Sequence, residues 1–456
     1  MRTNHRRTEH WTLRVGIGAL LGSLWVTAAA QTAGPQWSAD IAAGVEHTDN
    51  LNRTEQSPES ASFGTARGHF TLLQQTRTLY ADFDGVGIWR DFPTGTPGPD
   101  FTPAADTLVV WTPVAERFSW RLSDNLGEIA PSSNGALAPV NRERLNVLST
   151  GPNLQIPWGD SNWFTAAARY GRVDYQISPA DGNRVAGQLG VAHGLDNGAL
   201  LSLNVSQART SLDSTDVRYD IGSLYANYLQ TGARGAIDGS VGVSRLRNSS
   251  DQSTGAYADV RLMRELTAQT SIVLDLVHRY GDAAAVFSRQ QDLETDIGSI
   301  ANVQPSGQAL RETAADLSLT WGARRTDAGF TLYHYRETQY GTSATTHRRG
   351  TDVLGYFEFK LLPNFIIGGE GAERWWSDET TDSARASELR GYVTWQFLSR
   401  LGLSAGAEHY TQSHSLQNYT ETRYFAALAW QVTRSEVVRE RPTFDTAARR
   451  RIQYGR

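Results

Sequence analysis

The stretch YFEFKLLPNFIIGGEG, residues 356–371, contains two runs of alternating residues on either side of Pro363-Asn364. Aromatic and aliphatic residues alternate with charged or small ones in both runs, which is the period-2 pattern of a β-hairpin with one apolar face. In a soluble protein this apolar face would pack into a core. In a membrane barrel it would contact lipid, and Glu358 and Lys360 would point inward. The rest of the chain has to decide between these two cases.

The composition excludes a helical membrane protein and leaves a membrane barrel open. The chain has 456 residues, of which 39% are hydrophobic and 20% charged. After residue 30 no apolar run approaches the roughly 18 residues that a membrane helix needs, whereas the alternating strands of a barrel give weak hydropathy signals. There is no Cys, which excludes disulfides and thiol chemistry. The net charge of -5 argues against a nucleic acid as partner, because binding phosphates requires a basic surface.

The two ends of the chain lie outside the alternating pattern. Residues 1–30 predict a cleaved signal peptide, with early basic residues, an apolar segment and Ala28-Ala29-Ala30 at the cleavage site. We therefore expect export, and localisation of a barrel over residues 31–433 to the bacterial outer membrane. Residues 434–456 are rich in Arg and predict a basic periplasmic tail, which is either a solvated end or a contact with an acidic partner or peptidoglycan.

The connections between strand-like runs carry the more specific signal. From Trp37 onward we expect about 20 strands (18 to 22), and no helix of useful length. Tight connections such as 267–268 and 399–400 alternate along the chain with long polar ones such as 125–142 and 281–310. Short periplasmic turns and long external loops are typical of outer-membrane proteins. The sequence therefore predicts an all-β fold, a transmembrane antiparallel up-and-down β-barrel.

Several common catalytic and phosphate-binding motifs are missing from the sequence. There is no G-x-S-x-G, no H-E-x-x-H and no phosphate-binding loop, and the ten His are scattered over loops and strand ends. We therefore predict that the protein is not an enzyme and has no catalytic, cofactor-binding or metal site.

Charged residues on the face opposite the apolar one are the candidate functional residues. They could pair across neighbouring strands and make the water-exposed inner wall of the barrel rigid. Alternatively, they could form a polar conduit that guides a hydrophilic solute. Long loops in compact folds tend to be functional, so residues 281–310 are expected to constrict or cover the lumen. The lumen-lining candidates are Asp82, Asp84, Arg90, Asp259, Arg261, Glu265, Asp275, Arg279, Asp316, Glu358, Lys360, Glu370, Arg374, Glu388, Arg390, Glu421 and Arg423.

Two features resemble the β-barrel porin 2 family. One is GVEHTDNLNRT, residues 44–54, a first strand running into an Asp-Asn-Leu loop; the other is the whole-chain plan of a signal peptide, no plug domain and many hairpins. The resemblance implies export or handling of an exopolysaccharide, with polysaccharide and periplasmic secretion components as partners beside outer-membrane lipid. It supplies no ligand residues, and the basic tail departs from the family pattern. The alternatives are a general or solute-specific porin, a structural or adhesive barrel displaying its loops, or a barrel enzyme.

Overall fold

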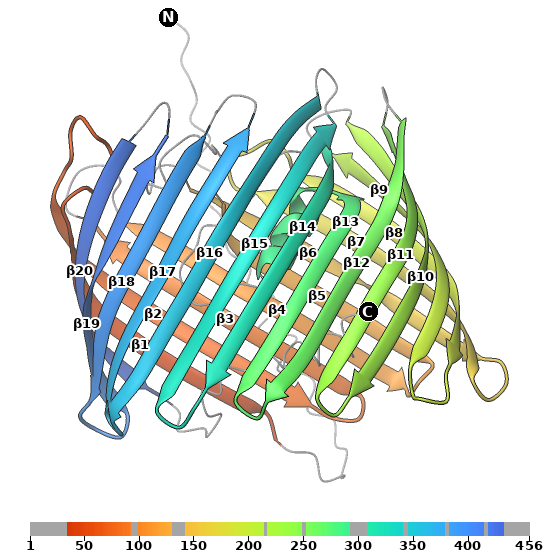
Figure 1. Cartoon of the computed structure of the whole chain (residues 1–456), viewed down its shortest axis with the longest axis horizontal. Coiled ribbons are helices and arrows are strands. Elements are labelled where there is room, and N and C mark those ends of the chain that lie inside the picture. The colour runs from red at the N-terminus through yellow and green to blue at the C-terminus, as the bar shows by residue number, and fades with distance from the viewer. Residues whose placement is uncertain are drawn as a thin grey trace, which may run out of the picture. The chain divides into compact units, whose positions relative to one another are not determined.

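The structure is a computed structural model that describes residues 34–92, 99–129, 142–213, 217–248, 252–291, 308–340, 345–378, 383–414 and 418–432. The described residues from Pro35 onward belong to one compact unit. Its strands form a 20-stranded sheet in which every neighbouring pair is antiparallel (Figure 1).

The strands follow one another in chain order around the sheet. They are β1 Gln36–Thr48, β2 Ala61–Gln75, β3 Leu79–Asp91, β4 Asp100–Val114, β5 Phe118–Ile129, β6 Glu143–Pro157, β7 Asn162–Tyr175, β8 Gly182–Gly194, β9 Leu200–Leu212, β10 Arg218–Gly232, β11 Gly235–Asn248, β12 Gln252–Thr267, β13 Thr270–Gly281, β14 Ala309–Gly322, β15 Thr326–Tyr340, β16 Thr345–Leu362, β17 Phe365–Asp378, β18 Ala384–Gln396, β19 Leu401–Ser413 and β20 Asn418–Gln431.

Pairing between the first and last strands closes the sheet into a barrel. β1 pairs with β20 over Asp40 to Thr48, and Ile41 lies opposite Trp430. Closure removes the exposed strand edge, so that every strand has a hydrogen-bonding neighbour on both sides, as a structure surrounded by lipid requires. The predicted fold class, a transmembrane antiparallel barrel of about 20 strands, is confirmed.

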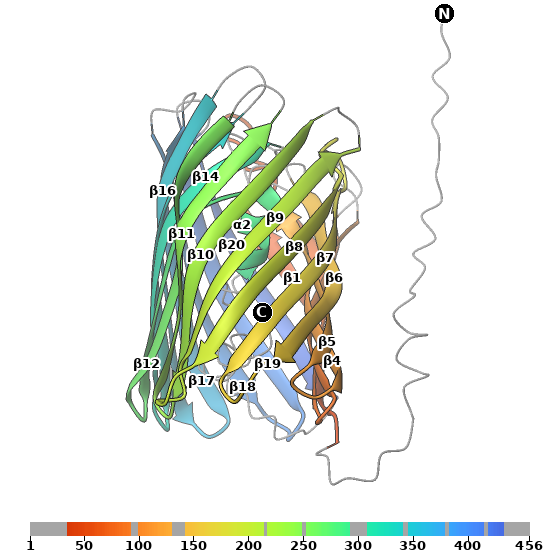
Figure 2. The same ribbon diagram turned by 90° about the vertical axis from the view of Figure 1, so that its right-hand side faces the viewer.

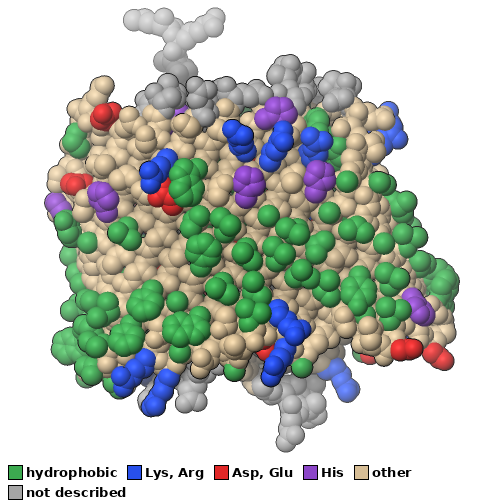
Figure 3. Space-filling view, viewed as in Figure 1, with side chains coloured by type: hydrophobic (Ala, Val, Ile, Leu, Met, Phe, Trp, Pro, Cys, Tyr) green, Lys and Arg blue, Asp and Glu red, His purple; other side chains and the backbone are tan. Residues whose placement is uncertain are grey.

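The outer face of the barrel is apolar. In the hairpin of β16 and β17, Leu362 lies opposite Phe365 across the two-residue turn, and Phe357 lies opposite Gly369. Phe357 and Ile367 are 50% and 42% exposed. Similar side chains cover the middle of the outer face (Figure 3). A soluble protein would bury them, so their exposure identifies this face as the one that contacts lipid.

Glycines on the inner wall accept the rings of tyrosines from the neighbouring strand. A Cβ at Gly329 would lie 2.2 Å from the ring of Tyr356, its register partner, and a Cβ at Gly368 would lie 2.2 Å from the ring of Tyr392. Glycine inside a strand is normally unfavourable, and a close approach of another group explains its presence here. The pairs therefore fix the orientation of inward-pointing tyrosines.

The connection between β13 and β14 contains a helix that the sequence analysis missed. Helix α2 spans Ala283–Gln291. Asp282 caps it, because its Oδ1 accepts a hydrogen bond of 2.8 Å from the backbone N–H of Ala285. A capping Asp before three alanines is a helix-start signal, but nine residues are too few to show a clear helical period. No helix among the described residues is long and apolar enough to cross a membrane.

Candidate functional site

The charged residues predicted to line the lumen all occupy the inward face of the barrel. Their register partners place each of them on the side opposite the exposed apolar residues, from Asp82 on β3 to Arg423 on β20. Strand parity predicts this placement because the side-chain period of a strand is two. Strand parity does not reveal which of these residues contact one another.

Several of them form ion pairs across neighbouring strands. On β12 and β13, the Nη2 of Arg261 lies 2.6 Å from Oδ2 of Asp275, and the Nη1 of Arg279 lies 3.0 Å from Oδ2 of Asp259. Asp275 is buried and faces Asp316 of β14 in the register. Arg261 therefore offsets the charge of the Asp275 carboxylate and reduces its repulsion with the neighbouring Asp316 carboxylate.

A second group of inward-facing charges lies on β16 to β18. Tyr392 Oη donates a hydrogen bond of 2.6 Å to Oε1 of Glu358. Arg390 Nη1 lies 3.7 Å from Oε2 of Glu370, and the Arg390 guanidinium carbon lies 4.7 Å from the centre of the Phe425 ring. These contacts hold the side chains against the wall.

The densest charged group lies where β1 and β20 close the barrel, at the end that carries the longer connections. The Nε of Arg53 donates a hydrogen bond of 2.6 Å to Oε2 of Glu421, and Nη2 of Arg423 donates one of 2.9 Å to Oε1 of the same carboxylate. Thr48 Oγ1 also donates to Oε1 of Glu421, at 2.7 Å. Glu421 thus receives three hydrogen bonds while it is almost completely buried.

Arg53 belongs to the stretch GVEHTDNLNRT, and its surroundings explain that stretch. The amide Nδ2 of Asn50 donates hydrogen bonds of 2.9 Å to the carbonyl oxygens of Thr54 and Thr420. The turn places Arg53, with a positive φ of 50°, beside Glu421. Burial is the largest single effect and lowers the pKa of Arg53, but the Glu421 carboxylate together with Tyr419 and Tyr410 raises it, so the net pKa lies above the ordinary value. Arg53 remains charged.

Arg142 and Arg90 extend this group along the inner wall. Arg142 precedes β6, and its Nη1 lies 3.6 Å from Oε2 of Glu128. Arg90 on β3 donates a hydrogen bond of 3.1 Å to Oγ1 of Thr102. Burial, followed by repulsion from Arg90, lowers the pKa of Arg142 to about 10. We call Arg53, Arg90, Arg142 and Arg423 the arginine group.

The arginine group has buried donors without acceptors. Among the residues that the structure describes, the buried Nε atoms of Arg90, Arg142 and Arg423 have no hydrogen-bond partner. An unsatisfied buried donor costs about 1–3 kcal/mol, and more when the group is charged. An anion or ordered water that settles against these guanidinium groups would lower this cost. Sequence reasoning found Arg90 and Arg423 through strand parity. It missed Arg53 and Arg142, because both lie in connections.

Helix α2 lies inside the barrel (Figure 2). Its Val286 and Phe287 are buried in a cluster with Ile129, Leu145 and Tyr175, which belong to β5, β6 and β7. The helix therefore contacts a wall that is far from β13 and β14 in the strand order.

Asp282, the residue that caps the helix, has further contacts on that wall. Its Oδ2 accepts a hydrogen bond of 3.0 Å from Tyr219 Oη on β10 and lies 3.6 Å from Nη1 of Arg184 on β8. The start of the connection between β13 and β14 is thus held to β10 and β8, which lie three and five strands away from β13 around the barrel.

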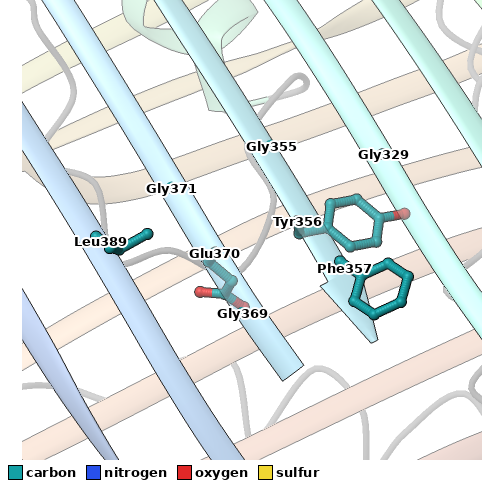
Figure 4. Close-up of a pocket in the computed structure, with 8 residues that line it drawn as sticks. All are labelled: Gly329, Gly355, Tyr356, Phe357, Gly369, Glu370, Gly371 and Leu389. Atoms are coloured by element: carbon teal, nitrogen blue, oxygen red, sulfur yellow. The ribbon is translucent and has the colours of Figure 1, made fainter. Parts of the chain in front are cut away.

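Two cavities lie in the wall of the barrel. One has a volume of about 350 Å³ and lies beside the hairpin that contains Pro363-Asn364 (Figure 4). Its lining includes Gly355, Gly369 and Leu389, which face outward, and one charged residue, Glu370, which faces inward. No set of polar groups converges on this cavity. Within the described ranges, no group of three or more His, Asp or Glu residues could hold a metal ion.

No known protein family and no curated protein matches this sequence. Solved structures with a similar fold include a ferric enterobactin receptor mutant from Pseudomonas aeruginosa, with 10% identity, a TM-score of 0.44, and coverage of 88% of this chain and 81% of that chain. Copper transporter OprC has 13% identity and a TM-score of 0.41 over 87% of this chain and 80% of its own. The siderophore receptor PirA from Acinetobacter baumannii has 8% identity and a TM-score of 0.42 over 87% and 80%.

These findings correct two expectations. The resemblance to the β-barrel porin 2 family is wrong, because no family model matches this chain. Export of an exopolysaccharide, which was expected from that resemblance, is wrong with it, as is the porin alternative; the structural or adhesive barrel stays an untested prediction. Polysaccharide and periplasmic secretion components have no support as partners. The physical reason lies in residues 44–54, where the side chains form a local turn and an ion pair rather than a family-specific site.

Proposed function

We propose that this outer-membrane barrel takes up a small, negatively charged nutrient and recognises it at the arginine group. In this proposal the longer connections face the outside of the cell and the tight turns face the periplasm, as in other outer-membrane barrels. The predicted signal peptide of residues 1–30 directs the chain to that membrane, and the inward-facing charges line the path of the solute.

The observation that carries the proposal is the incomplete pairing of the arginine group. Guanidinium groups bind carboxylates and phosphates through two parallel hydrogen bonds, and Arg is therefore the usual residue for such anions. Arg90 and Arg142 have weaker carboxylate contacts than Arg53, at 3.8 Å to Asp100 and 3.6 Å to Glu128. They are the members of the group that could turn toward a solute without losing a short ion pair.

Helix α2 supports a selective rather than an open passage. A barrel of this size would leave a wide aqueous channel if its interior held only the wall side chains. The helix and Asp282 contact strands β5 to β10 from within, so they occupy part of that interior. In a narrowed passage a solute must come close to the wall charges, where a positive group raises the local concentration of anions.

Binding to the purified protein tests this recognition. Calorimetric titration in uncharged detergent micelles compares gluconate with glucose, which has similar size and no charge. We expect the wild-type protein to bind gluconate more tightly than glucose, and the double variant R90Q/R142Q to bind gluconate about tenfold or more weakly than wild type, since two charge-assisted contacts are lost. Arg77→Gln, an exposed residue at a tight turn, is the matched control and should behave as wild type. Equal binding of the two solutes by the wild-type protein would overturn the proposal.

A further inference from the structure

The outer face of the barrel carries a basic region next to the apolar one. On the outward side of β13 to β16, near the longer connections, arginines and histidines replace the apolar side chains found nearer the middle of the barrel. Figure 3 shows a band of such residues above the hydrophobic ones. We call these residues the outer basic patch; they are His278, Arg311, His334, Arg336, His347 and Arg349.

The arginines of the outer basic patch are placed against one another. Arg336 on β15 and Arg349 on β16 are direct register partners, and both are exposed. Arg311 on β14 lies opposite Thr338, two residues from Arg336. Like charges directly opposite each other on a sheet are destabilising. A negative charge close to these arginines is therefore needed to offset the repulsion between their guanidinium groups.

The described residues do not supply that counter-charge. Among them, Arg336 has no ion pair, and the Nε of Arg349 donates a hydrogen bond of 3.0 Å to the neutral Ser377. No acidic residue of β13 to β16 faces outward within the described ranges. Glu373 on β17 does face outward, but Arg385 binds it. An anion from outside the chain is thus the natural partner.

The histidines of the patch are held in a common orientation. The Nδ1 of His278 lies 2.8 Å from Oγ1 of Thr313, and the Nδ1 of His334 lies 2.9 Å from Oγ1 of Thr351, the register partner in each case. His347 has the same arrangement with Thr338, at 3.2 Å. Because the hydroxyl binds Nδ1, the Nε2 of each ring is left to meet a ligand.

A depression lies directly below the basic side chains. It has a volume of about 290 Å³, and its lining includes the small outward-facing Ala258 and Ala315, together with Leu276. His278 and His334 also line it. The depression thus joins an apolar floor to a basic edge.

We propose that the outer basic patch binds a phosphate-bearing lipid of the outer leaflet, a glycolipid of the lipid A type. The phosphate lies between Arg336 and Arg349 and within reach of the histidines, and an acyl chain packs along the depression over Ala258 and Ala315. Arginine binds phosphate bidentately, and a phosphate placed there removes the repulsion between the opposed guanidinium groups. A free anion satisfies the charges but gains nothing from the apolar floor, so the lipid is the favoured occupant.

Thermal unfolding of the full chain in dodecyl maltoside micelles, whose headgroups are uncharged, tests this inference. Circular dichroism is recorded with added diphosphoryl lipid A, with its dephosphorylated form, and with inorganic phosphate at the same phosphate concentration. A ligand that binds only the folded state raises the transition temperature, so titration yields its affinity. We expect stabilisation by diphosphoryl lipid A and little effect from the other two.

Variants locate the site. R336Q/R349Q should bind diphosphoryl lipid A about tenfold or more weakly, since two charge-assisted contacts are lost. R245Q/R247Q removes two exposed, outward-facing arginines from β11 and should bind as wild type. Equal weakening in both variants would mean a general charge effect and would overturn the site. Equal stabilisation of the wild-type protein by inorganic phosphate or by the dephosphorylated lipid would overturn the assignment of a phosphorylated glycolipid, and this comparison does not depend on a variant that folds.

Discussion

Replacing Phe287 by Ala should release helix α2 from the barrel wall. Phe287 is completely buried and packs with Ile129, Leu145 and Tyr175. Truncation of a buried Phe to Ala costs about 3–5 kcal/mol. At about 1.5–3 kcal/mol for each large apolar residue, full burial of Val286 and Phe287 contributes about 3–6 kcal/mol, so the substitution removes a large part of the apolar contribution to docking.

The consequence is local rather than global. A nine-residue helix is not stable alone in water, so the undocked segment unfolds. Loss of 3–5 kcal/mol lowers the ratio of docked to undocked helix by roughly a hundred- to several-thousand-fold. The strands keep their hydrogen bonds, because the ladder between β13 and β14 does not depend on the helix.

Amide hydrogen exchange with peptide resolution measures this effect. We expect the amides of residues 283–288 to exchange much faster in Phe287→Ala, while those of β13 keep their protection. Phe164→Ala is the matched control: Phe164 is 44% exposed on the outer face, so its loss should leave the helix protected. Wild-type protection of residues 283–288 in Phe287→Ala would refute the argument that this side chain holds the helix in place.

Two further substitutions test the inner wall, through chemical denaturation of the purified protein. Gly329→Ala should lower the free energy of unfolding by about 1–3 kcal/mol because the new methyl group meets the ring of Tyr356, whereas Gly391→Ala, which has open space, should change it by less than about 0.5 kcal/mol. Equal stability of the two variants would contradict the close approach. Glu421→Gln should lower it by about 3–5 kcal/mol because it removes the buried carboxylate that forms ion pairs with Arg53 and Arg423. The double variant E421Q/R53Q should lose less than the two single variants together, and strict additivity would count against the buried pair.

The strands were predictable because their signals are local. Side chains of a strand alternate with a period of two, so an alternation of apolar and polar residues distinguishes the side chains that face lipid from those that face the lumen. The alternation of tight and long connections indicated which ends of the strands lie together. The predicted hairpin at Pro363-Asn364 therefore agrees with β16 and β17, including the outward position of Phe357.

The helix and the arginine group were less accessible, for different reasons. α2 is short, and most of its stabilisation comes from contacts with strands β5 to β7, which no local pattern reveals. Arg53 and Arg142 lie in connections where strand parity does not apply. The family assignment failed because the side chains of residues 44–54 form a turn and an ion pair with Glu421. A short turn of polar residues does not identify a protein family.

The sequence by itself determined the class of fold, the approximate number of strands and, for strands with a clear alternation, the face that is turned to lipid; the facing of some strands, such as residues 328–338, stayed open. These follow from periodicity and from connection lengths, which are properties of neighbouring residues. Only the tertiary structure decided how the charges combine. Closure of β1 against β20 brings Thr48 and Arg53 to Glu421, more than 360 residues away in the chain. The register of β15 and β16 sets Arg336 against Arg349 on the outside. The pairing of strands places charged groups within a few ångströms of one another, and electrostatic interactions at that range depend on distance rather than on sequence order.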